Sequence, residues 1–263
     1  MSLGNPTPDD ESRRSKERNI MKAITLMDML KAGVHFGHKK SLWNPKMSAY
    51  IYATRNNIHI LDLEKTKNKL MEAMNFAADV ASRGGTVLFV GTKRQAKDEV
   101  RKAAESAGMP YVVTRWLGGT FTNFRTIQRT IKKMERYEKM IADGEIKKYT
   151  KKEQLMIARE VEKMKTFFSG IKDMKKLPEA IFVLDTKFDH IPVEEARQSK
   201  VKVIGLVDTN SDPTKVDYMI PSNDDAIKVI SFMANAMAEA IKDGRSKLAS
   251  TVMEQTEGAA VAK

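Results

Sequence analysis

Carboxylates and a histidine stand where the sequence predicts buried strands to end, and this pattern could bind a divalent metal ion. Asp208 directly follows the apolar run Val201–Val207, and Asp224 precedes a predicted helix. Both should lie at the carboxyl-terminal edge of a sheet, where the loop that carries His38 could also fold. One imidazole and two carboxylates are a suitable donor set for such an ion. We therefore expect His38, Asp208 and Asp224 to form either a structural metal site or an ordinary hydrogen-bonded cluster.

A second group, Asp185, Asp189 and His190, follows another apolar run. Catalysis would require a nucleophile, or a metal with defined ligands, beside these residues. The sequence offers no serine elbow, no HExxH motif and no paired-carboxylate pattern. Capping and turn formation at a strand end are therefore the expected roles of this group.

The tripeptide Gly91-Thr92-Lys93 follows the strand predicted for Thr86–Val90 and raises the question of nucleotide binding. Amides at a helix N-terminus can bind phosphate. A P-loop, however, needs two glycines at fixed spacing before its lysine, and a dinucleotide fingerprint needs three glycines. Neither motif is present. We expect Thr92 and Lys93 to begin a helix and to approach an RNA phosphate.

Two tryptophans stand beside cations and turn residues, a combination typical of RNA recognition. Trp43 lies close to Lys46, and Trp116 follows Arg115 directly. Aromatic rings can stack on unpaired bases while cations bind phosphates, although either ring could instead cover the edge of the core. The residues that we predict to contact RNA are Lys39, Lys40, Trp43, Lys46, Arg55, Lys93, Arg94, Arg115, Trp116, Arg125, Arg129 and Lys132.

Strands and helices that alternate along the chain predict the scaffold for these residues. Thr86–Val90 predicts a buried strand, Lys93–Ala107 an amphipathic helix and Tyr111–Val113 a second strand. Further buried strands are expected at Ala180–Leu184 and Val201–Val207. This alternation predicts a three-layer α/β fold with a largely parallel sheet, whose ligands would lie beyond the carboxyl ends of the strands.

Two helices interrupt this alternation and are predicted to form an antiparallel hairpin. Arg125–Ile141 carries an apolar stripe and is broken by Asp143-Gly144. Thr150 and Glu153 then form a capping-box pattern at the start of the second helix. Apolar residues at alternating four- and three-residue steps in that helix indicate a coiled-coil seam. The lysines and arginines on exposed positions of the hairpin favour contact with a phosphate backbone.

The two ends of the chain are predicted to be flexible. Residues 1–20 are polar and basic, as in a disordered tail. The last helix is expected to span Ala226–Lys242 and to end at Gly244, followed by a flexible tail over residues 246–263. The rest divides into a discontinuous α/β domain, residues 21–124 and 172–245, and a hairpin insert, residues 125–171.

The composition narrows the class of function. The 263 residues include 46 Lys and Arg against 34 Asp and Glu, and the resulting net charge of +12 predicts a polyanionic partner. The absence of cysteine excludes disulfides and thiol catalysis, and indicates a reducing, cytoplasmic compartment. No apolar run reaches the roughly 20 residues that cross a bilayer, so no membrane partner is expected.

Several long motifs resemble one family, bacterial small-subunit ribosomal protein two (the S-two family). They include MDMLKAGVHFGHKKSLWNPKM, LFVGTKRQAKDEV, RWLGGTFTNF and VIGLVDTNSDPTKVDYMIPSNDDAI, in the family's order between Ala23 and Arg245. The resemblance implies a flavodoxin-like α/β domain with an inserted coiled-coil hairpin. It also implies a structural protein of the small subunit that binds ribosomal RNA near the head–body junction and helps to recruit the messenger-binding ribosomal protein one. The residues up to Ile20 depart from the family pattern.

We therefore expect a ribosomal RNA-binding protein that is not an enzyme, requires no cofactor and has no small-molecule substrate. Such a protein would neutralise phosphates from a rigid scaffold. The alternative is a nucleotide-binding enzyme on a Rossmann-like sheet, which would explain the fold but not the missing phosphate motif. A DNA-binding architectural protein would match the charge, but the sequence contains no recognisable groove-reading element.

Overall fold

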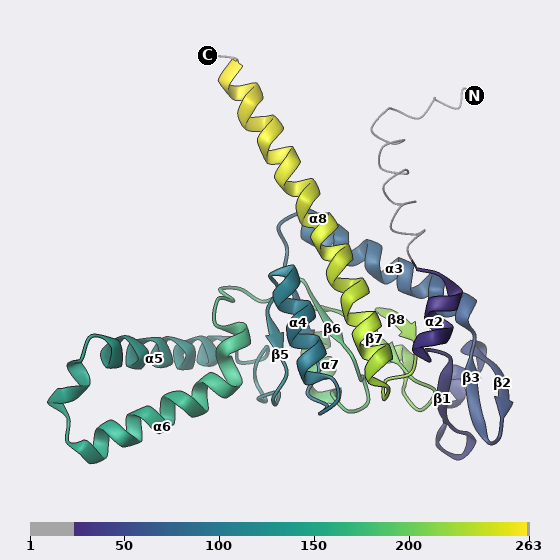
Figure 1. The fold of residues 1–263 in the computed structure, drawn as a ribbon, viewed down its shortest axis with the longest axis horizontal. Coiled ribbons are helices and arrows are strands. Elements are labelled where there is room, and N and C mark those ends of the chain that lie inside the picture. Colours follow the sequence, from purple (N-terminus) through teal and green to yellow (C-terminus); the bar gives the residue numbers. More distant parts are fainter. Residues whose placement is uncertain (1–23, 262–263) are drawn as a thin grey trace.

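The central sheet consists of five parallel strands, β4 (Val87–Val90), β5 (Tyr111–Val112), β6 (Ala180–Val183), β7 (Lys202–Val207) and β8 (Tyr218–Pro221) (Figure 1). The computed structural model describes residues 24–261, with side chains described to residue 249, so the predicted tail over residues 1–20 lies outside the described residues. The spatial order is β5-β4-β6-β7-β8. Counted along the chain within this sheet, that order is 2-1-3-4-5, the flavodoxin-like arrangement. The predicted parallel α/β sheet is confirmed.

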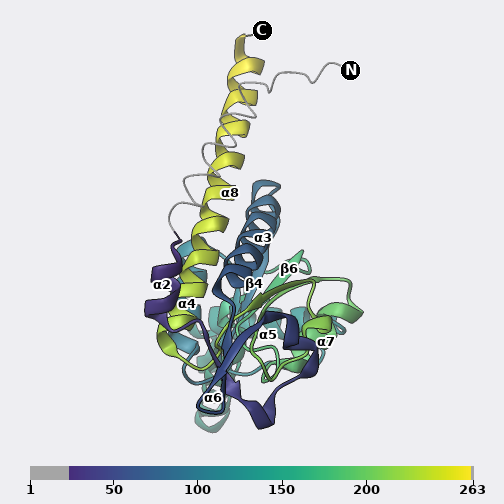
Figure 2. The same ribbon diagram turned by 90° about the vertical axis from the view of Figure 1, so that its right-hand side faces the viewer.

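Four helices cover the two faces of this sheet: α3 (Leu63–Ser82), α4 (Lys97–Ala107), α7 (His190–Gln198) and α8 (Ile227–Val261). Side chains alternate along each strand, so that Val87 and Phe89 of β4 join a core with α3, α4 and α8. Leu88 and Val90 join a second core with α7 on the opposite face. Figure 2 shows α4 and α8 on one side of the sheet and α7 on the other. The predicted three layers are therefore confirmed.

A smaller antiparallel sheet lies at one end of the molecule and contains β1 (Phe36–Lys39), β2 (Ile51–Arg55) and β3 (Ile58–Leu61) in the order β1-β3-β2. Asn56 and Asn57 have φ angles of 50° and 60° in the turn between β2 and β3. The loop predicted around His35 and His38 is partly wrong. It contains β1, which gains its hydrogen bonds by pairing with β3, and the short helices η1 (Lys40–Leu42) and η2 (Pro45–Tyr50).

Helix α2 (Leu26–Ala32) is capped at both ends. The Thr25 hydroxyl accepts a hydrogen bond from the Asp28 amide at 3.1 Å, and the Asp28 carboxylate accepts one from the Thr25 amide at 3.4 Å. Gly33 follows the helix with φ of 90°, a left-handed conformation that favours glycine. The two hydrogen bonds at Thr25 form a capping box.

The two predicted hairpin helices are present as α5 (Phe124–Ala142) and α6 (Lys151–Phe168), joined through η3 (Glu145–Lys148) and followed by η4 (Ser169–Ile171). Figure 1 shows them running side by side away from the sheet. Ile131 of α5 and Val161 of α6 lie in one buried cluster, and Lys133 Nζ pairs with Glu160 Oε1 at 2.7 Å across the helices. The predicted Thr150 capping box is also confirmed. Coiled-coil packing between the helices stays a prediction.

Helix α8 does not end at Gly244 as predicted, because it continues to Val261. Gly244 instead allows close contact with α3: a Cβ at this position would lie 2.2 Å from the carbonyl oxygen of Ala78. The predicted flexibility of residues 246–263 stays a prediction. Despite the length of α8, none of the helices within residues 24–261 is both long and apolar enough to span a membrane.

Replacing Gly244 by alanine should lower the free energy of unfolding by about 1–3 kcal/mol, the usual cost of forcing an extra group into a packed contact. The physical reason is that the Ala78 carbonyl belongs to the backbone of α3 and cannot rotate away. Gly118→Ala is the matched control, since a Cβ there meets nothing within 4 Å. Urea unfolding of both variants tests the prediction, and equal midpoints would contradict it.

Candidate functional site

The point where the strand order reverses, between β4 and β6, is the usual ligand site of a flavodoxin-like sheet. In this chain the residues that follow these two strands bind each other there. The amide and hydroxyl of Thr92 donate to the Asp189 carboxylate at 3.1 and 2.6 Å. Asp185 Oδ1 accepts hydrogen bonds from the amides of Lys187 and Phe188, as predicted for turn formation. The protein's own side chains therefore occupy this position.

Lys93 lies within a group of carboxylates at the same edge of the sheet. Its ammonium is 3.0 Å from Asp185 Oδ2, 3.5 Å from Asp224 Oδ1 and 2.6 Å from Asp225 Oδ1. Burial alone would lower the pKa of Lys93, but the Asp225 hydrogen bond and the Asp224 charge outweigh it and raise the pKa well above its ordinary value. Lys93 is therefore positively charged and fully engaged.

Two predictions about Lys93 are wrong. Its side chain is only 17% exposed and is paired with three acids, so it is not available to an RNA phosphate. It also does not begin a helix, because residues 93–96 form a turn and α4 starts at Lys97. No local pattern indicates this pairing, since the nearest acid of the group is 92 positions away in the sequence.

The three residues predicted as a metal site do come together. One ligand atom from each of His38, Asp208 and Asp224 lies within 4.8 Å of the others. His38 Nδ1 is 3.1 Å from Asp208 Oδ2, and its Nε2 is 3.4 Å from Asp225 Oδ2. Gly37 makes this approach possible, because a Cβ there would lie 2.6 Å from the methyl group of Thr209. Strand β1 thus brings His38 over the end of β7.

Electrostatics of this cluster favour a cation. The carboxylates of Asp208 and Asp224 are both buried, and Asp224 Oδ1 accepts no hydrogen bond. Burial, together with the charges of Asp185 and Asp208, raises the pKa of Asp224 to about 8. The hydrogen bond from His38 to Asp208, despite burial, raises the pKa of His38. Within residues 24–249, the only cation paired with the buried Asp224 Oδ1 is the Lys93 ammonium at 3.5 Å, so a divalent ion could still coordinate this oxygen and the donor set fits the predicted metal.

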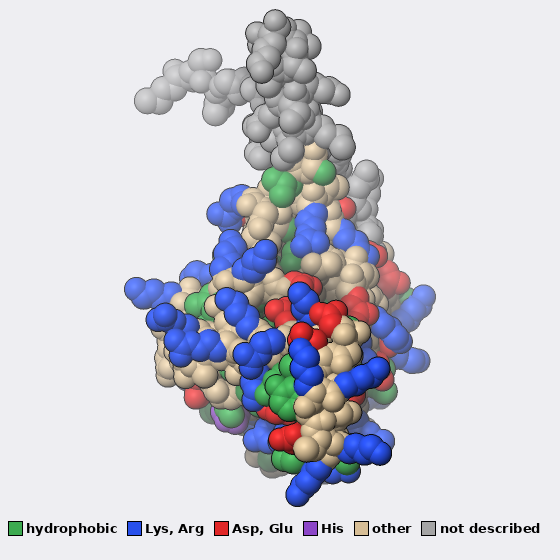
Figure 3. All heavy atoms as spheres, turned by 90° about the vertical axis from the view of Figure 1, so that its left-hand side faces the viewer, with side chains coloured by type: hydrophobic (Ala, Val, Ile, Leu, Met, Phe, Trp, Pro, Cys, Tyr) green, Lys and Arg blue, Asp and Glu red, His purple; other side chains and the backbone are tan. Residues whose placement is uncertain are grey.

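Most of the cations predicted to contact RNA lie on two surfaces, one beside each edge strand of the central sheet, β8 and β5 (Figure 1). The sheet-end surface, on and beside the three-stranded sheet, contains Lys39, Lys40, Trp43, Lys46 and Arg55. The hairpin-base surface contains Arg115, Arg125, Arg129 and Lys132. Arg94 is exposed between them, in the segment from β4 to α4. Figure 3 shows lysine and arginine side chains spread over the hairpin-bearing face of the molecule, with acidic side chains gathered in patches between them.

Lys46 is exposed but paired. Its ammonium is 2.9 Å from Asp212 Oδ2 and 3.1 Å from the Thr214 hydroxyl, at the start of the short helix η5 (Pro213–Lys215). This hydrogen bond from Lys46, with that of Thr214, lowers the pKa of Asp212 to about 2. An ion pair at the surface is worth roughly 0–1 kcal/mol, so a phosphate can compete for Lys46.

The two tryptophans differ. Trp43 is 36% exposed and its ring lies 5.3 Å from the ring of His59, so one face is open. Trp116 is only 6% exposed, packs edge-on against Phe121 and donates its indole N–H to the Glu195 carboxylate at 3.2 Å. The prediction that Trp116 stacks on an RNA base is therefore wrong, because the ring belongs to the core.

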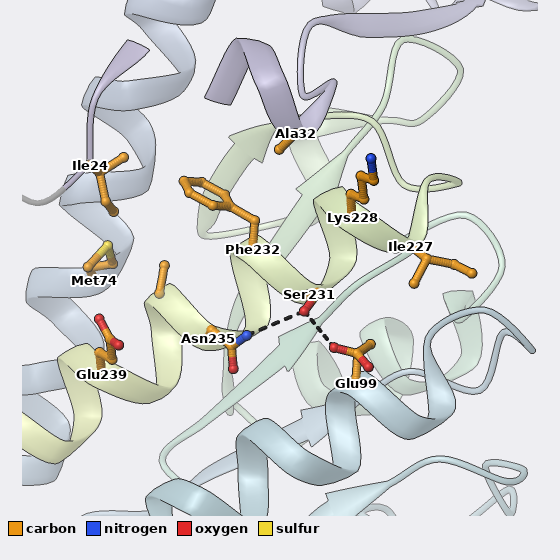
Figure 4. A pocket seen from close by; sticks show the side chains of 11 residues that line it. Ile24, Ala32, Met74, Glu99, Ile227, Lys228, Ser231, Phe232, Asn235 and Glu239 are labelled. Carbon is orange, nitrogen blue, oxygen red and sulfur yellow. Dashed lines mark hydrogen bonds between the residues drawn. The ribbon is translucent and has the colours of Figure 1, made fainter. Parts of the chain in front are cut away.

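A hollow of about 600 Å³ lies along α8, between α2, α3 and α4 (Figure 4). In its lining the Ser231 hydroxyl donates to Glu99 at 2.5 Å and accepts from the Asn235 amide at 3.3 Å. Phe232, Met74 and Ile227 contribute its apolar lining. Its described lining holds no cluster of titratable groups comparable to the one around Lys93, so this hollow does not resemble a catalytic site.

Comparison with protein families gives one finding. The sequence model of the family described as Ribosomal protein S2 matches residues 29–244, which is well over half of the chain. The matched range contains the Lys93 cluster, the hairpin and both basic surfaces.

Proposed function

The chain belongs to the ribosomal protein S2 family and is thus a structural, non-enzymatic protein of the small ribosomal subunit, and from this premise we propose that it binds small-subunit ribosomal RNA directly. The sheet-end and hairpin-base surfaces contact phosphates, and Trp43 stacks on an unpaired base. Arg94 adds a contact between them. The protein performs this RNA-binding function on ribosomes in the cytoplasm.

The filled ligand position is the observation that best supports this proposal over a nucleotide-binding enzyme. A nucleotide at the β4–β6 position would have to break the Thr92–Asp189 hydrogen bonds, and its phosphates would meet the acids around Lys93. The cations of the sheet-end and hairpin-base surfaces, by contrast, are exposed and belong to other segments of the chain. A polyanion that lies across the outside of the protein meets positive charge without displacing internal contacts.

Titration of the purified protein with either RNA or nucleotide separates the two functions. We expect binding of a small-subunit ribosomal RNA transcript with an affinity that falls linearly with salt on logarithmic axes. We expect no calorimetric signal with ATP, GTP or NADH at micromolar concentrations. Nucleotide binding in that range together with salt-independent RNA binding would contradict the proposal.

The family resemblance further supports docking of ribosomal protein one, and we place that docking on the three-stranded sheet. Tyr52 is 77% exposed and Phe36 50% exposed there, which gives a protein partner two large apolar side chains to cover. Tyr52→Ala should reduce the amount of ribosomal protein one that copurifies with small subunits severalfold, as measured by quantitative mass spectrometry. Tyr149→Ala, an exposed tyrosine near the hairpin tip, is the control and should have no effect.

A divalent ion held by His38, Asp208 and Asp224 is a second part of the proposal. The ion would neutralise two buried carboxylates and would tie β1 to the ends of β7 and β8. It would have no catalytic task. Support comes from the Asp224 oxygen that accepts no hydrogen bond and from the short distances within the cluster.

Zinc at a hundredfold excess over its dissociation constant should raise the free energy of unfolding by about 2.7 kcal/mol, the amount that binding to the folded state alone supplies. His38→Ala should abolish this increase, whereas His190→Ala, at an exposed histidine outside the cluster, should leave it unchanged. Urea unfolding with zinc, magnesium or a chelator measures the effect. Equal stabilisation of both variants would show that the ion binds elsewhere.

A further inference from the structure

A buried carboxylate connects α7 to the segment that leads into the hairpin. Glu195 Oε1 accepts hydrogen bonds from the Gly119 amide at 2.7 Å and from the Trp116 indole at 3.2 Å. Its Oε2 accepts from the Phe121 amide at 2.9 Å and from the Thr122 amide and hydroxyl, both at 3.3 Å. All five donors belong to residues 116–122, which link β5 to α5.

This carboxylate is held as an anion by neutral donors. Among the ion pairs of residues 24–249, none includes Glu195. Burial acts to raise the pKa of Glu195, but the amide hydrogen bonds of Phe121 and Gly119 outweigh it, so that its pKa lies below the ordinary value. Successive backbone amides that converge on one anion form a nest, here filled by a side chain from another element.

The clamped segment fixes the base of the hairpin. Trp116 and Phe121 pack at a centroid distance of 5.0 Å and an interplanar angle of 89°. Both belong to the buried cluster that continues through Ile127 of α5 to Phe168 of α6. Arg115 directly precedes the clamped segment and Arg125 lies just inside α5, so two cations of the hairpin-base surface are attached to its ends.

We propose that Glu195 is a positioning residue for RNA binding: its carboxylate holds residues 116–122 so that the hairpin-base cations keep a fixed arrangement toward the RNA backbone. This inference rests on the proposed function. It predicts that the contribution of Arg125 to RNA affinity depends on Glu195, whereas the contribution of Arg55, on the sheet-end surface, does not. Glu195 itself contacts no RNA, because it is buried.

Double-mutant cycles on the full-length protein test this dependence. Glu195→Gln keeps the shape of the side chain but removes its charge and turns an NH₂ group toward the amide donors. We expect it to weaken binding of a small-subunit ribosomal RNA transcript about tenfold, a typical size for coupling within one hydrogen-bond network. Combined with Arg125→Ala, the losses should be less than additive, and combined with Arg55→Ala they should add. Glu194→Gln, at the exposed neighbouring residue, is the control and should change neither affinity nor coupling.

The alternative outcomes are distinct. Equal coupling of Glu195→Gln to Arg125 and to Arg55 would show a general loss of folding and would overturn the proposal, as would unchanged affinity. If Glu195→Gln fails to fold by circular dichroism, Trp116→Phe removes a single donor and should give the same pattern at smaller size. Hydrogen exchange at the Gly119 and Phe121 amides reports on the clamp without RNA. If exchange is faster in Glu195→Gln but the wild-type protein binds no RNA, Glu195 does hold residues 116–122. The proposed RNA-binding function is then the part that is refuted.

Discussion

Replacing Arg115, Arg125, Arg129 and Lys132 together by alanine should lower the affinity for small-subunit ribosomal RNA on the order of a hundredfold at about 0.15 M salt. Each lost phosphate contact removes roughly 0.7–0.9 from the slope of log affinity against log salt concentration, so four contacts remove about 3. A slope smaller by about 3 corresponds to that loss of affinity between 1 M and about 0.15 M salt. Fluorescence anisotropy with a labelled RNA transcript, measured over a series of salt concentrations, gives both quantities.

The control for this variant removes the same number of exposed cations from elsewhere on the protein. None of the four control residues belongs to either basic surface. Replacing them lowers the net charge as much as the first variant does, but it should reduce the slope of log affinity against log salt concentration by less than about 1. If both variants lose the same affinity and slope, binding depends on overall charge and the assigned hairpin-base surface is wrong. The control residues, all exposed, are Arg101, Lys102, Lys187 and Lys228.

The second large effect concerns stability. Lys93→Met should lower the free energy of unfolding at neutral pH by about 3–5 kcal/mol, the range measured when one partner of a buried ion pair is removed. Asp185 and Asp224 would remain buried without their cation, since their side chains are only 9% and 2% exposed. Urea unfolding with a chelator present measures the loss. Lys102→Met is the matched control: its ammonium pairs with Glu99 but is 72% exposed, so its loss should cost less than about 1 kcal/mol.

The pH dependence of this contribution follows from its sign. The pKa of Lys93 is higher in the folded protein than in the unfolded chain, so the folded state binds the proton more tightly. The resulting stabilisation is complete below the ordinary lysine pKa of roughly 10.4 and is lost as pH rises beyond it. Asp224, with a pKa of about 8, gains charge between pH 7 and pH 9, so we expect the difference between wild type and Lys93→Met not to shrink in that range and to shrink only above it. A difference that already disappears by pH 8 would contradict the ion-pair explanation.

Patterns that depend on near neighbours in the sequence predicted the structure well. The capping box at Thr150 needs only residues three positions apart, and it is present. The buried strands were recognisable because parallel strands covered on both faces are continuously apolar. The residues of the predicted metal site lie together as expected, since the carboxyl ends of parallel strands meet at one edge, and metal binding itself stays a prediction.

Features that depend on distant partners could not be predicted in this way. A tryptophan beside an arginine and two glycines is typical of an exposed recognition loop, but Trp116 is buried because Glu195, 79 positions later, accepts its N–H. Glycine near the end of an apolar stripe usually marks a helix end, yet Gly244 is required by the backbone of α3. The same residue type serves both purposes, and only the position of Ala78 distinguishes them.

The sheet and its four covering helices separate the sheet-end and hairpin-base surfaces and set the distance between them. In the proposed complex, once one surface is bound, the other is held near its RNA site at high effective concentration, so two weak contacts produce strong avidity. This gain requires two RNA segments whose spacing matches the distance between the two surfaces. The protein should therefore discriminate correctly folded ribosomal RNA from unfolded RNA of the same sequence, without reading a single base pair.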